Sequence, residues 1–341
     1  MDVIVLAGGF GTRLRPWTLH VPKPLIPILD RTMIEHVVSI LPENMVRRVL
    51  IAAGYGIEQM RTHFENANLP YEVIIVEETE PLGTGGAIAN CKAHLDGERC
   101  VVINGDLLTS LRLDEMLAAH RISGAMASIS LWEVEDPSRF GVADYNPDNK
   151  RIQRFQEKPK REDAYSNLIN AGTYILEPEV FDRMPEGAFS MERIVFPEMA
   201  EAGLLGGFPF DGHFVDAGTP PSYIEAMMTL ISNADWKRGY EANCDGIRNS
   251  WFGGASDIDS SASIADSAVD ANCSIAENVE VFRSAILSDA RIDSETIISG
   301  CMVGKGAHIG PQAKLENVVI DHGAKVPIYH QQIGGVFPTE E

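Results

Sequence analysis

A 17-residue repeat in the last third of the chain constrains its fold more than any other feature. Aliphatic or aromatic residues recur at this spacing in three columns: Ile247, Ile264, Val281, Ile298 and Leu315; Phe252, Val269, Ile286, Val303 and Ile320; and Ile258, Ile275, Ile292, Ile309 and Val326. The columns are five, six and six residues apart, so each turn of chain has three short sides with one inward side chain each. One coil cannot bury its own apolar face, whereas stacked coils can. The repeat therefore predicts a parallel β-helix over residues 247–330, ending where Gln332 breaks the first column.

This pattern resembles the hexapeptide left-handed parallel β-helix, shortened by one residue in each turn. Hexapeptide helices also occur in acyltransferases, and His308, His322 and His330 are available for a second activity of that kind. No acyl-CoA feature is evident, and we expect each of these histidines to be an exposed loop residue. We expect the β-helix to mediate homo-oligomerisation, as a dimer or a tetramer, because the open ends and flat sides of a solenoid pack readily.

Strands and helices alternate through the first hundred residues, which predicts a mostly parallel α/β sheet. The predicted strands cover residues 2–7, 47–53, 71–76 and 100–104, and the predicted helices cover 57–65 and 87–94. We expect a catalytic domain over 1–235, a linker over 236–246, the β-helix over 247–330 and a tail over 331–341.

A glycine loop follows the first strand. Gly8, Gly9 and Gly11 allow backbone N–H groups to approach a ligand closely, and a nest of such amides binds anions. Arg13 and Lys23 add positive charge in the same segment. The loop matches neither the phosphate loop G-x-x-x-x-G-K-[ST] nor the dinucleotide fingerprint G-x-G-x-x-G. A plain turn between strand and helix is the alternative.

Composition limits the classes of ligand and location. The 341 residues include 28 Lys and Arg against 49 Asp and Glu, a net charge of −21, so we expect no nucleic-acid partner. The five cysteines are odd in number and form no C-x-x-C pair, which argues against a disulfide framework or a zinc site. Without a signal peptide or a long apolar span, the chain is predicted to be cytoplasmic and to have no membrane partner.

The opening segment LAGGFGTRLRPWT, followed by PKPLIPI, resembles the signature of the sugar-1-phosphate nucleotidyltransferases. That family has a Rossmann-like α/β fold, and the segment PLGTGGA resembles its base-recognition loop. The resemblance implies catalytic roles for Arg13 and Lys23. It further implies a nucleotide-binding set made of Leu6, Ala7, Gly8, Gly9, Gly11, Thr12, Glu78 and Gly83.

Two carboxylates stand at strand ends. Asp106 follows a buried strand, and Asp216 stands just before a helix that Thr219 is predicted to cap, with Pro220 in its first position. Taken alone, such an aspartate is a turn former or a helix cap. The segments NGD and VDAGTPPSY resemble the family's metal motifs, which implies that Asp106 and Asp216 are catalytic ligands of Mg²⁺. The second acidic residue that many members carry after the first aspartate is missing from 107–110.

The part of the chain that is expected to bind the sugar lies between Asp106 and Asp216 in the sequence. The segments RFGV, FQEKP and INAG resemble the family's sugar-binding motifs, which implies that Gly141, Glu157 and Asn170 bind the sugar. Lys158 would present a point charge to the sugar phosphate, although a Glu-Lys pair alone is common on protein surfaces. The segment SMER resembles a substrate-adjacent helix start, and no role is assigned to Arg193.

The resemblance implies an enzyme that joins a nucleoside triphosphate to a sugar 1-phosphate and releases pyrophosphate. PLGTGGA, EKP, INAGTYIL and VFPEMA are most similar to mannose-1-phosphate guanylyltransferases, which favours GTP and mannose 1-phosphate. A glucose-1-phosphate thymidylyl- or uridylyltransferase is one alternative. A non-catalytic regulatory subunit that binds nucleotide sugars and a purely structural assembly protein are the others.

Overall fold

The computed structural model describes residues 1–42, 44–67, 69–233 and 246–338. The chain forms two compact units, one made of residues 1–10 and 34–214 and the other of 11–33 and 215–341. Residues 236–245 of the predicted linker, including Cys244, and residues 339–341 of the predicted tail lie outside the described residues. The predicted boundaries of the catalytic domain and of the linker remain a prediction.

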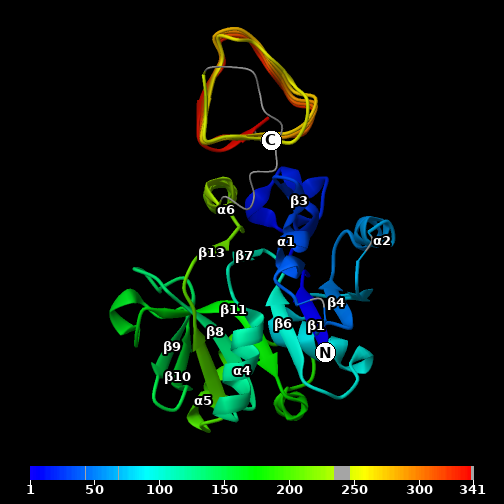
Figure 1. Cartoon of the computed structure of the whole chain (residues 1–341), viewed down its shortest axis with the longest axis vertical. Helices are drawn as coiled ribbons and strands as arrows, with labels where there is room; N and C mark the ends of the chain where they lie inside the picture. The colour runs from blue at the N-terminus through cyan, green and yellow to red at the C-terminus, as the bar shows by residue number, and fades with distance from the viewer. Residues whose placement is uncertain (43, 68, 234–245, 339–341) are drawn as a thin grey trace. The chain divides into compact units, whose positions relative to one another are not determined.

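The first unit is built on a nine-stranded mixed sheet (Figure 1). In spatial order its strands are β5 (Glu72–Glu77), β4 (Arg48–Ala53), β1 (Asp2–Leu6), β6 (Cys100–Asn104), β11 (Leu168–Leu176), β8 (Ala127–Glu133), β12 (Leu205–Pro209), β10 (Arg151–Glu157) and β9 (Gly141–Asn146). From β5 to β6 the neighbours are parallel, and β11 then runs antiparallel to β6 and β8. The strands of the parallel part read as apolar runs because both faces of the sheet are covered, and Val3, Ile4 and Val5 are fully buried. These strands confirm the predicted α/β class.

Short helices flank this sheet, and one of them begins earlier than predicted. They are α1 (Met33–Ser39), α2 (Ile57–Glu65), α3 (Gly83–Asn90), α4 (Leu113–Ser123) and α5 (Phe196–Glu201). The predicted helix over 87–94 is wrong at both ends, since α3 starts at Gly83 and 91–94 form a separate 3-10 turn. The carbonyl of Phe189 accepts hydrogen bonds from the N–H groups of Gly85 and Gly86, which satisfies two donors that a helix start leaves unpaired.

The second unit contains the β-helix, whose coils superpose as a triangle in Figure 1. Its first face is β14 (Ile247–Arg248), β17 (Ser263–Ala265), β20 (Glu280–Phe282), β23 (Ile297–Ser299), β26 (Lys314–Glu316) and β29 (Gln331–Ile333). The second is β15 (Trp251–Phe252), β18 (Ala268–Val269), β21 (Ala285–Ile286), β24 (Met302–Val303), β27 (Val319–Ile320) and β30 (Val336–Phe337). The third is β16 (Asp257–Ile258), β19 (Ser274–Ile275), β22 (Arg291–Ile292), β25 (His308–Ile309) and β28 (Lys325–Val326).

Paired residues in these parallel ladders are 17 apart, as the repeat predicts. The inward columns form one apolar core from Phe252 to Val326. The predicted end of the array at Gln332 is wrong, because Gln332 pairs with Leu315 and the ladder continues to Phe337. The backbone hydrogen bonds of a ladder do not depend on the side chain, so a polar residue in the inward column does not end the pairing.

The second unit also contains elements that precede the β-helix in sequence. They include the hairpin of β2 (Pro27–Ile28) and β3 (Arg31–Thr32), and α6 (Pro220–Ser232). Thr219 caps α6 as predicted, in a reciprocal capping box with Ser222. Trp17 is fully buried, and its Nε1–H donates a 2.9 Å hydrogen bond to the carbonyl of Ile320. The segment 11–33 is therefore tied to the β-helix.

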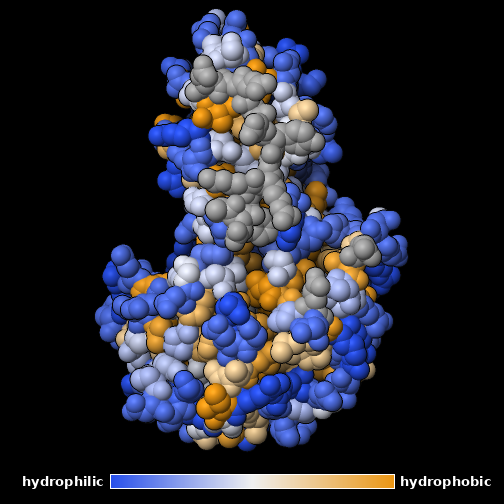
Figure 2. Space-filling view, viewed as in Figure 1, coloured by the Kyte–Doolittle hydropathy of each residue, from blue (hydrophilic) through white to orange (hydrophobic). Residues whose placement is uncertain are grey.

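Hydrophilic residues dominate the surface seen in Figure 2, as expected for a chain with 49 acidic residues. Among the described residues, no helix is both long enough and apolar enough to cross a membrane.

Candidate active site

In the first unit, the predicted nucleotide residues lie at the carboxyl ends of the parallel strands. Leu6 ends β1, and its carbonyl accepts a 2.9 Å hydrogen bond from the N–H of Gly105. This bond holds the loop after β6, with the half-buried Asp106, against the start of the glycine loop at Ala7 and Gly8. Ligands of open α/β sheets bind at this edge.

Glu78, which follows β5, lies directly against the glycine loop. A Cβ atom at Gly8 would clash with Glu78 Oε1, so a larger residue there would require this carboxyl group to shift. Burial raises the pKa of Glu78 above its ordinary value, although a hydrogen bond from the Leu82 backbone N–H acts in the opposite direction. The structure thus brings together Gly8 and Glu78, both predicted from sequence to bind the nucleotide.

Backbone conformation and packing require glycine at position 83. Its φ is +68°, and a Cβ atom there would lie 2.6 Å from the carbonyl oxygen of Phe189. The glycines of PLGTGGA therefore let the segment 187–189 approach the start of α3. The predicted contact of Gly83 with a base stays a prediction.

The predicted sugar residues come together on three strands. Gly141 pairs with Glu157 across β9 and β10, and a Cβ atom at Gly141 would lie 3.0 Å from Glu157 Oε2. β11 joins β9 through the pair Ile169 and Val142, next to Asn170. A sugar in this region would find hydrogen-bond acceptors and donors from separate strands.

Lys158 has a strained backbone, with φ of +50°. Its N–H donates to the carbonyl of Phe140, and its Nζ lies 3.0 Å from Glu157 Oε1. The Glu157 side chain is 12% exposed and that of Lys158 56%, so the ammonium group is accessible to solvent. Strained non-glycine residues of this kind cluster at ligand sites.

In the second unit, three predicted catalytic residues gather around Gly218. A Cβ atom at Gly218 would lie 2.7 Å from Asp216 Oδ1, 2.9 Å from Arg13 Nη2 and 3.2 Å from Lys23 Nζ. Asp216 is the last residue of β13 (Phe214–Asp216), whereas Arg13 comes from the 3-10 turn Thr12–Leu14. Gly11 begins that turn in the left-handed region. Two cations and a carboxylate thus converge from segments about 200 residues apart in sequence.

These residues fit a divalent cation with phosphate ligands. Carboxylate oxygens are the ligands that Mg²⁺ prefers, and it commonly takes one or two of them together with substrate phosphates. Among the described residues there is no group of three or more His, Cys, Asp and Glu that could hold a metal alone. Asp106 and Asp216 belong to different compact units, and the prediction that they share one ion stays a prediction.

Sequence reasoning missed two features of the site. Gly218 entered only as part of a resemblance, and its role in accommodating three charged groups needs the tertiary structure. Glu192, in the segment SMER, is buried and accepts hydrogen bonds from three hydroxyl groups. Two of its three donors, Tyr174 and Thr84, lie 18 and 108 residues away, so no local pattern could have identified the network.

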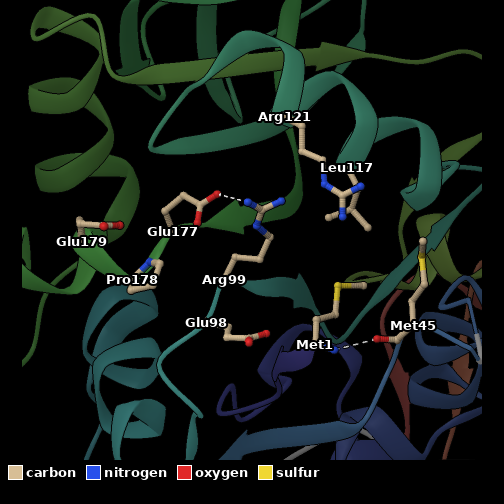
Figure 3. A pocket seen from close by; sticks show the side chains of 9 residues that line it. All are labelled: Met1, Met45, Glu98, Arg99, Leu117, Arg121, Glu177, Pro178 and Glu179. Carbon is tan, nitrogen blue, oxygen red and sulfur yellow. Dashed lines mark hydrogen bonds and ion pairs between the residues drawn. The ribbon is translucent and has the colours of Figure 1, made fainter.

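A cavity of about 620 Å³ lies elsewhere, at the opposite edge of the sheet (Figure 3). Met1 precedes β1, Arg99 precedes β6 and Glu177 follows the antiparallel β11, so these lining residues mark the amino ends of the parallel strands. Arg99 is paired with Glu177 at 2.7 Å. None of the residues predicted to bind substrate lines this cavity.

Two family models match the chain, one in each half. Residues 2–233 match the model "Nucleotidyl transferase", and residues 248–333 match "GMPPB C-terminal domain". Mannose-1-phosphate guanylyltransferase 1 of Arabidopsis thaliana is 32% identical over 332 residues, which cover 94% of this chain and 90% of that protein. Mannose-1-phosphate guanylyltransferase catalytic subunit beta of Danio rerio is 32% identical over 336 residues, with the same coverage.

Solved structures of related proteins agree with the fold. HddC from Yersinia pseudotuberculosis is 30% identical, and the match covers 66% of this chain and 97% of HddC, with a TM-score of 0.57. HddC has also been solved in complex with GMP-PN. A UDP-glucose pyrophosphorylase complexed with UDP-glucose is 25% identical, covers 66% of this chain and 96% of its own, and has a TM-score of 0.58. This chain therefore belongs to the nucleotidyl transferase family, as a sugar-1-phosphate nucleotidyltransferase, and it is similar to mannose-1-phosphate guanylyltransferases over nearly its whole length.

Proposed function

We propose that this sugar-1-phosphate nucleotidyltransferase joins GTP to mannose 1-phosphate, giving GDP-mannose and pyrophosphate. The observation that carries the proposal is the gathering of Arg13, Lys23 and Asp216 around Gly218. Two cations beside a carboxylate suit a polyphosphate with a divalent cation. The relatives named for GTP and mannose 1-phosphate support this choice of substrates.

The reaction needs positioning and charge neutralisation more than proton transfer. A phosphate oxygen of the sugar 1-phosphate forms a bond to the α-phosphorus, and the bond from that phosphorus to the pyrophosphate oxygen breaks. This oxygen is already ionised at neutral pH, so no general base is required. Catalysis then rests on orientation and on electrostatic stabilisation of the transition state.

Each predicted residue has a place in this scheme. Backbone amides of Gly8, Gly9 and Gly11 approach the nucleotide and its phosphates. Arg13 and Lys23 neutralise the phosphates, and Arg13 stabilises the charge that develops in the transition state. Removal of one such group costs on the order of 3 kcal/mol of barrier.

Mg²⁺, held by Asp106 and Asp216, would supply further charge neutralisation when bound. On the sugar side, Glu157, Asn170 and the amide of Gly141 hold the hydroxyl groups. Lys158, whose ammonium group pairs with Glu157 and belongs to a side chain that is 56% exposed, orients the attacking phosphate.

The proposal is tested by substitution of two of the three charged groups beside Gly218. Arg13→Ala and Asp216→Ala should each lower turnover at least about a hundredfold, as expected for loss of one electrostatic contact to the transition state. The measurement is pyrophosphate release, with the melting temperature as a control for folding. Near wild-type turnover in both variants would show that the site is misplaced.

The substrates are tested by a matrix of GTP, ATP, UTP and dTTP against mannose, glucose and N-acetylglucosamine 1-phosphates. GTP with mannose 1-phosphate should give the highest kcat/KM. A higher value for glucose 1-phosphate with a thymidine or uridine nucleotide would replace the proposed substrates while leaving the reaction unchanged. No pyrophosphate release with any pair would favour a non-catalytic regulatory subunit.

We further propose a cytoplasmic homo-oligomer, dimer or tetramer, assembled through the β-helix. Sedimentation of the intact chain tests the assembly, and a monomer at micromolar concentration would contradict it.

A further inference from the structure

A buried carboxylate links the two sides of the candidate active site. Glu192 Oε2 accepts hydrogen bonds of 2.6 Å from the hydroxyl groups of both Thr84 and Ser190, and Oε1 accepts one of 3.1 Å from the hydroxyl of Tyr174. The Glu192 residue is 9% exposed. Within the described part of the chain, no lysine, arginine or histidine forms an ion pair with it.

Such a carboxylate is a costly way to stabilise a core. A buried charge is expensive unless it is paired, and an apolar side chain of similar size would fill the same space more cheaply. The three hydroxyl donors compensate the burial only while their geometry is maintained. The network therefore acts as a geometric constraint on the groups that donate to it.

One arm of the network leads to the sugar side. The Tyr174 hydroxyl accepts a 3.0 Å hydrogen bond from Asn170 Nδ2, and Asn170 Oδ1 accepts one of 2.9 Å from the N–H of Gly172. Burial raises the pKa of Tyr174 well above its ordinary value, so its phenol stays protonated and donates to Glu192. Both polar ends of the Asn170 side chain are thereby held in place.

The other arm leads to the start of α3. The Thr84 hydroxyl donates to Glu192 and accepts a 3.1 Å hydrogen bond from the N–H of Met191. Gly85 and Gly86 donate to the carbonyl of Phe189, two residues before Met191. The loop predicted to recognise the base is thus clamped to the segment that carries Glu192.

Both segments have irregular backbones at the network residues. Glu192 lies in a π-helical turn, Met191–Val195, and β11 shifts register between Asn170 and Tyr174 where Gly172 has φ of +71°. Single π-helical turns and strand bulges occur frequently at functional sites, where they re-aim a side chain. A residue that served packing alone would not need either irregularity.

We propose that Glu192 is a positioning residue. It fixes the loop over 82–86 relative to the side chain of Asn170, so that nucleotide and sugar phosphate are aligned for reaction. The inference rests on the proposed function, because it takes the loop as the nucleotide side and Asn170 as the sugar side. Glu192 itself does not contact the substrates.

The test separates the two arms of the network by measuring the KM of the nucleoside triphosphate and the KM of the sugar 1-phosphate. Thr84→Val removes the donor on the nucleotide side and should raise the KM of the nucleoside triphosphate at least fivefold, with little change for the sugar 1-phosphate. Tyr174→Phe should raise the KM of the sugar 1-phosphate at least fivefold, with little change for the nucleoside triphosphate. Glu192→Gln replaces an oxygen acceptor by a donor, so it should raise both KM values, and adding Thr84→Val to it should raise the nucleotide KM no further.

Two controls distinguish positioning from folding. Thr84→Ser keeps the hydroxyl and should restore wild-type KM values. Thr173→Val is the matched control, because Thr173 is fully buried on β11 and its hydroxyl makes no hydrogen bond to the described residues. This variant should leave both KM values unchanged.

The outcomes are distinguishable. An active wild-type enzyme whose Glu192→Gln variant loses thermal stability but keeps both KM values would overturn the inference and leave the proposed function intact. Equal effects of Thr84→Val and Tyr174→Phe on both substrates would also overturn it. A wild-type protein that releases no pyrophosphate with any substrate pair would overturn both.

Discussion

At the scale of single residues, there are different physical reasons for glycine at positions 8 and 9 of the opening loop. Gly8 faces the buried carboxyl of Glu78, which would have to shift to admit a larger residue. A Cβ atom at Gly9 would have no atom of the described protein within 4 Å, and its φ is not left-handed, so internal packing does not require glycine at this position. The prediction that Gly9 binds the nucleotide, with its backbone close to the ligand, supplies a reason for glycine that packing does not.

Alanine substitutions at these two positions should therefore have different effects. Gly9→Ala should leave the melting temperature unchanged and raise the KM of the nucleoside triphosphate about tenfold or more, because its methyl group occupies space that the phosphates need. Gly8→Ala should cost about 1–3 kcal/mol of unfolding free energy through overpacking against Glu78. Thermal unfolding and steady-state kinetics measure both effects. An unchanged nucleotide KM in Gly9→Ala would remove Gly9 from the predicted binding set.

At the scale of elements, β1 is joined to its neighbour β4 by ion pairs as well as by the backbone hydrogen bonds of the ladder. Asp2 begins β1, and its side chain is 1% exposed. Arg48, at the start of β4, donates to its carboxylate at 2.5 Å, and Arg47 donates at 3.0 Å. Burial alone would raise the pKa of Asp2, but the hydrogen bonds from the two arginines outweigh it and the pKa lies below its ordinary value of 3.8.

This shift predicts how stability depends on pH. Because the folded-state pKa of Asp2 is lowered, its contribution is fully present above about pH 4 and is lost as the pH falls through the folded value. Asp2→Asn should lower the unfolding free energy at pH 7 by roughly 1.5–3 kcal/mol, as for loss of a charge-assisted hydrogen bond, and by less near pH 3. Denaturant titrations at the two pH values measure this. Asp114→Asn, at an exposed pair with Arg112, is the control and should change nothing measurable. A cost independent of pH would contradict the assignment.

At the scale of the whole molecule, the β-helix supports the segment that carries two of the predicted catalytic cations. Trp17 lies between Arg13 and Lys23 in sequence, and its ring stacks on His322 with centroids 5.5 Å apart. The prediction that His308, His322 and His330 are exposed loop residues is wrong, since all three are half-buried and His308 lies in β25. His322 does lie in a turn, where burial lowers its pKa and its Nδ1 accepts a hydrogen bond from the N–H of Lys305. The second unit thus joins the segment 11–33 to the repeat through specific contacts.

A substitution on the β-helix should consequently affect catalysis. His322→Ala removes the stacking partner of Trp17 and should lower kcat about tenfold through misplacement of Arg13 and Lys23. His308→Ala is the matched control, because His308 stands on the same repeat, pairs with Asp293 at 2.7 Å and should leave kcat unchanged. Pyrophosphate release measures both variants. Equal kcat values in the two variants and the wild type would show that the β-helix does not support the catalytic segment.

Features set by short-range patterns could be predicted from the sequence. The 17-residue columns, the apolar strands from Asp2 and from Cys100, and the cap of α6 at Thr219 all depend on residues close together in the chain or evenly spaced along it. The start of α3 could not be predicted, because its first amide donors are satisfied by Phe189, more than a hundred residues away. A helix start that is capped from outside carries no local signal.

What only the tertiary structure decided is which distant groups meet. The partners of Glu192 lie 2, 18 and 108 residues away, and the charges around Gly218 come from both ends of the chain's first 220 residues. The sequence by itself determined the period of the β-helix and the family motifs, because repeated burial and short motifs are written in neighbouring positions. The contacts among those motifs depend on how the whole chain packs, and no spacing along the sequence encodes them.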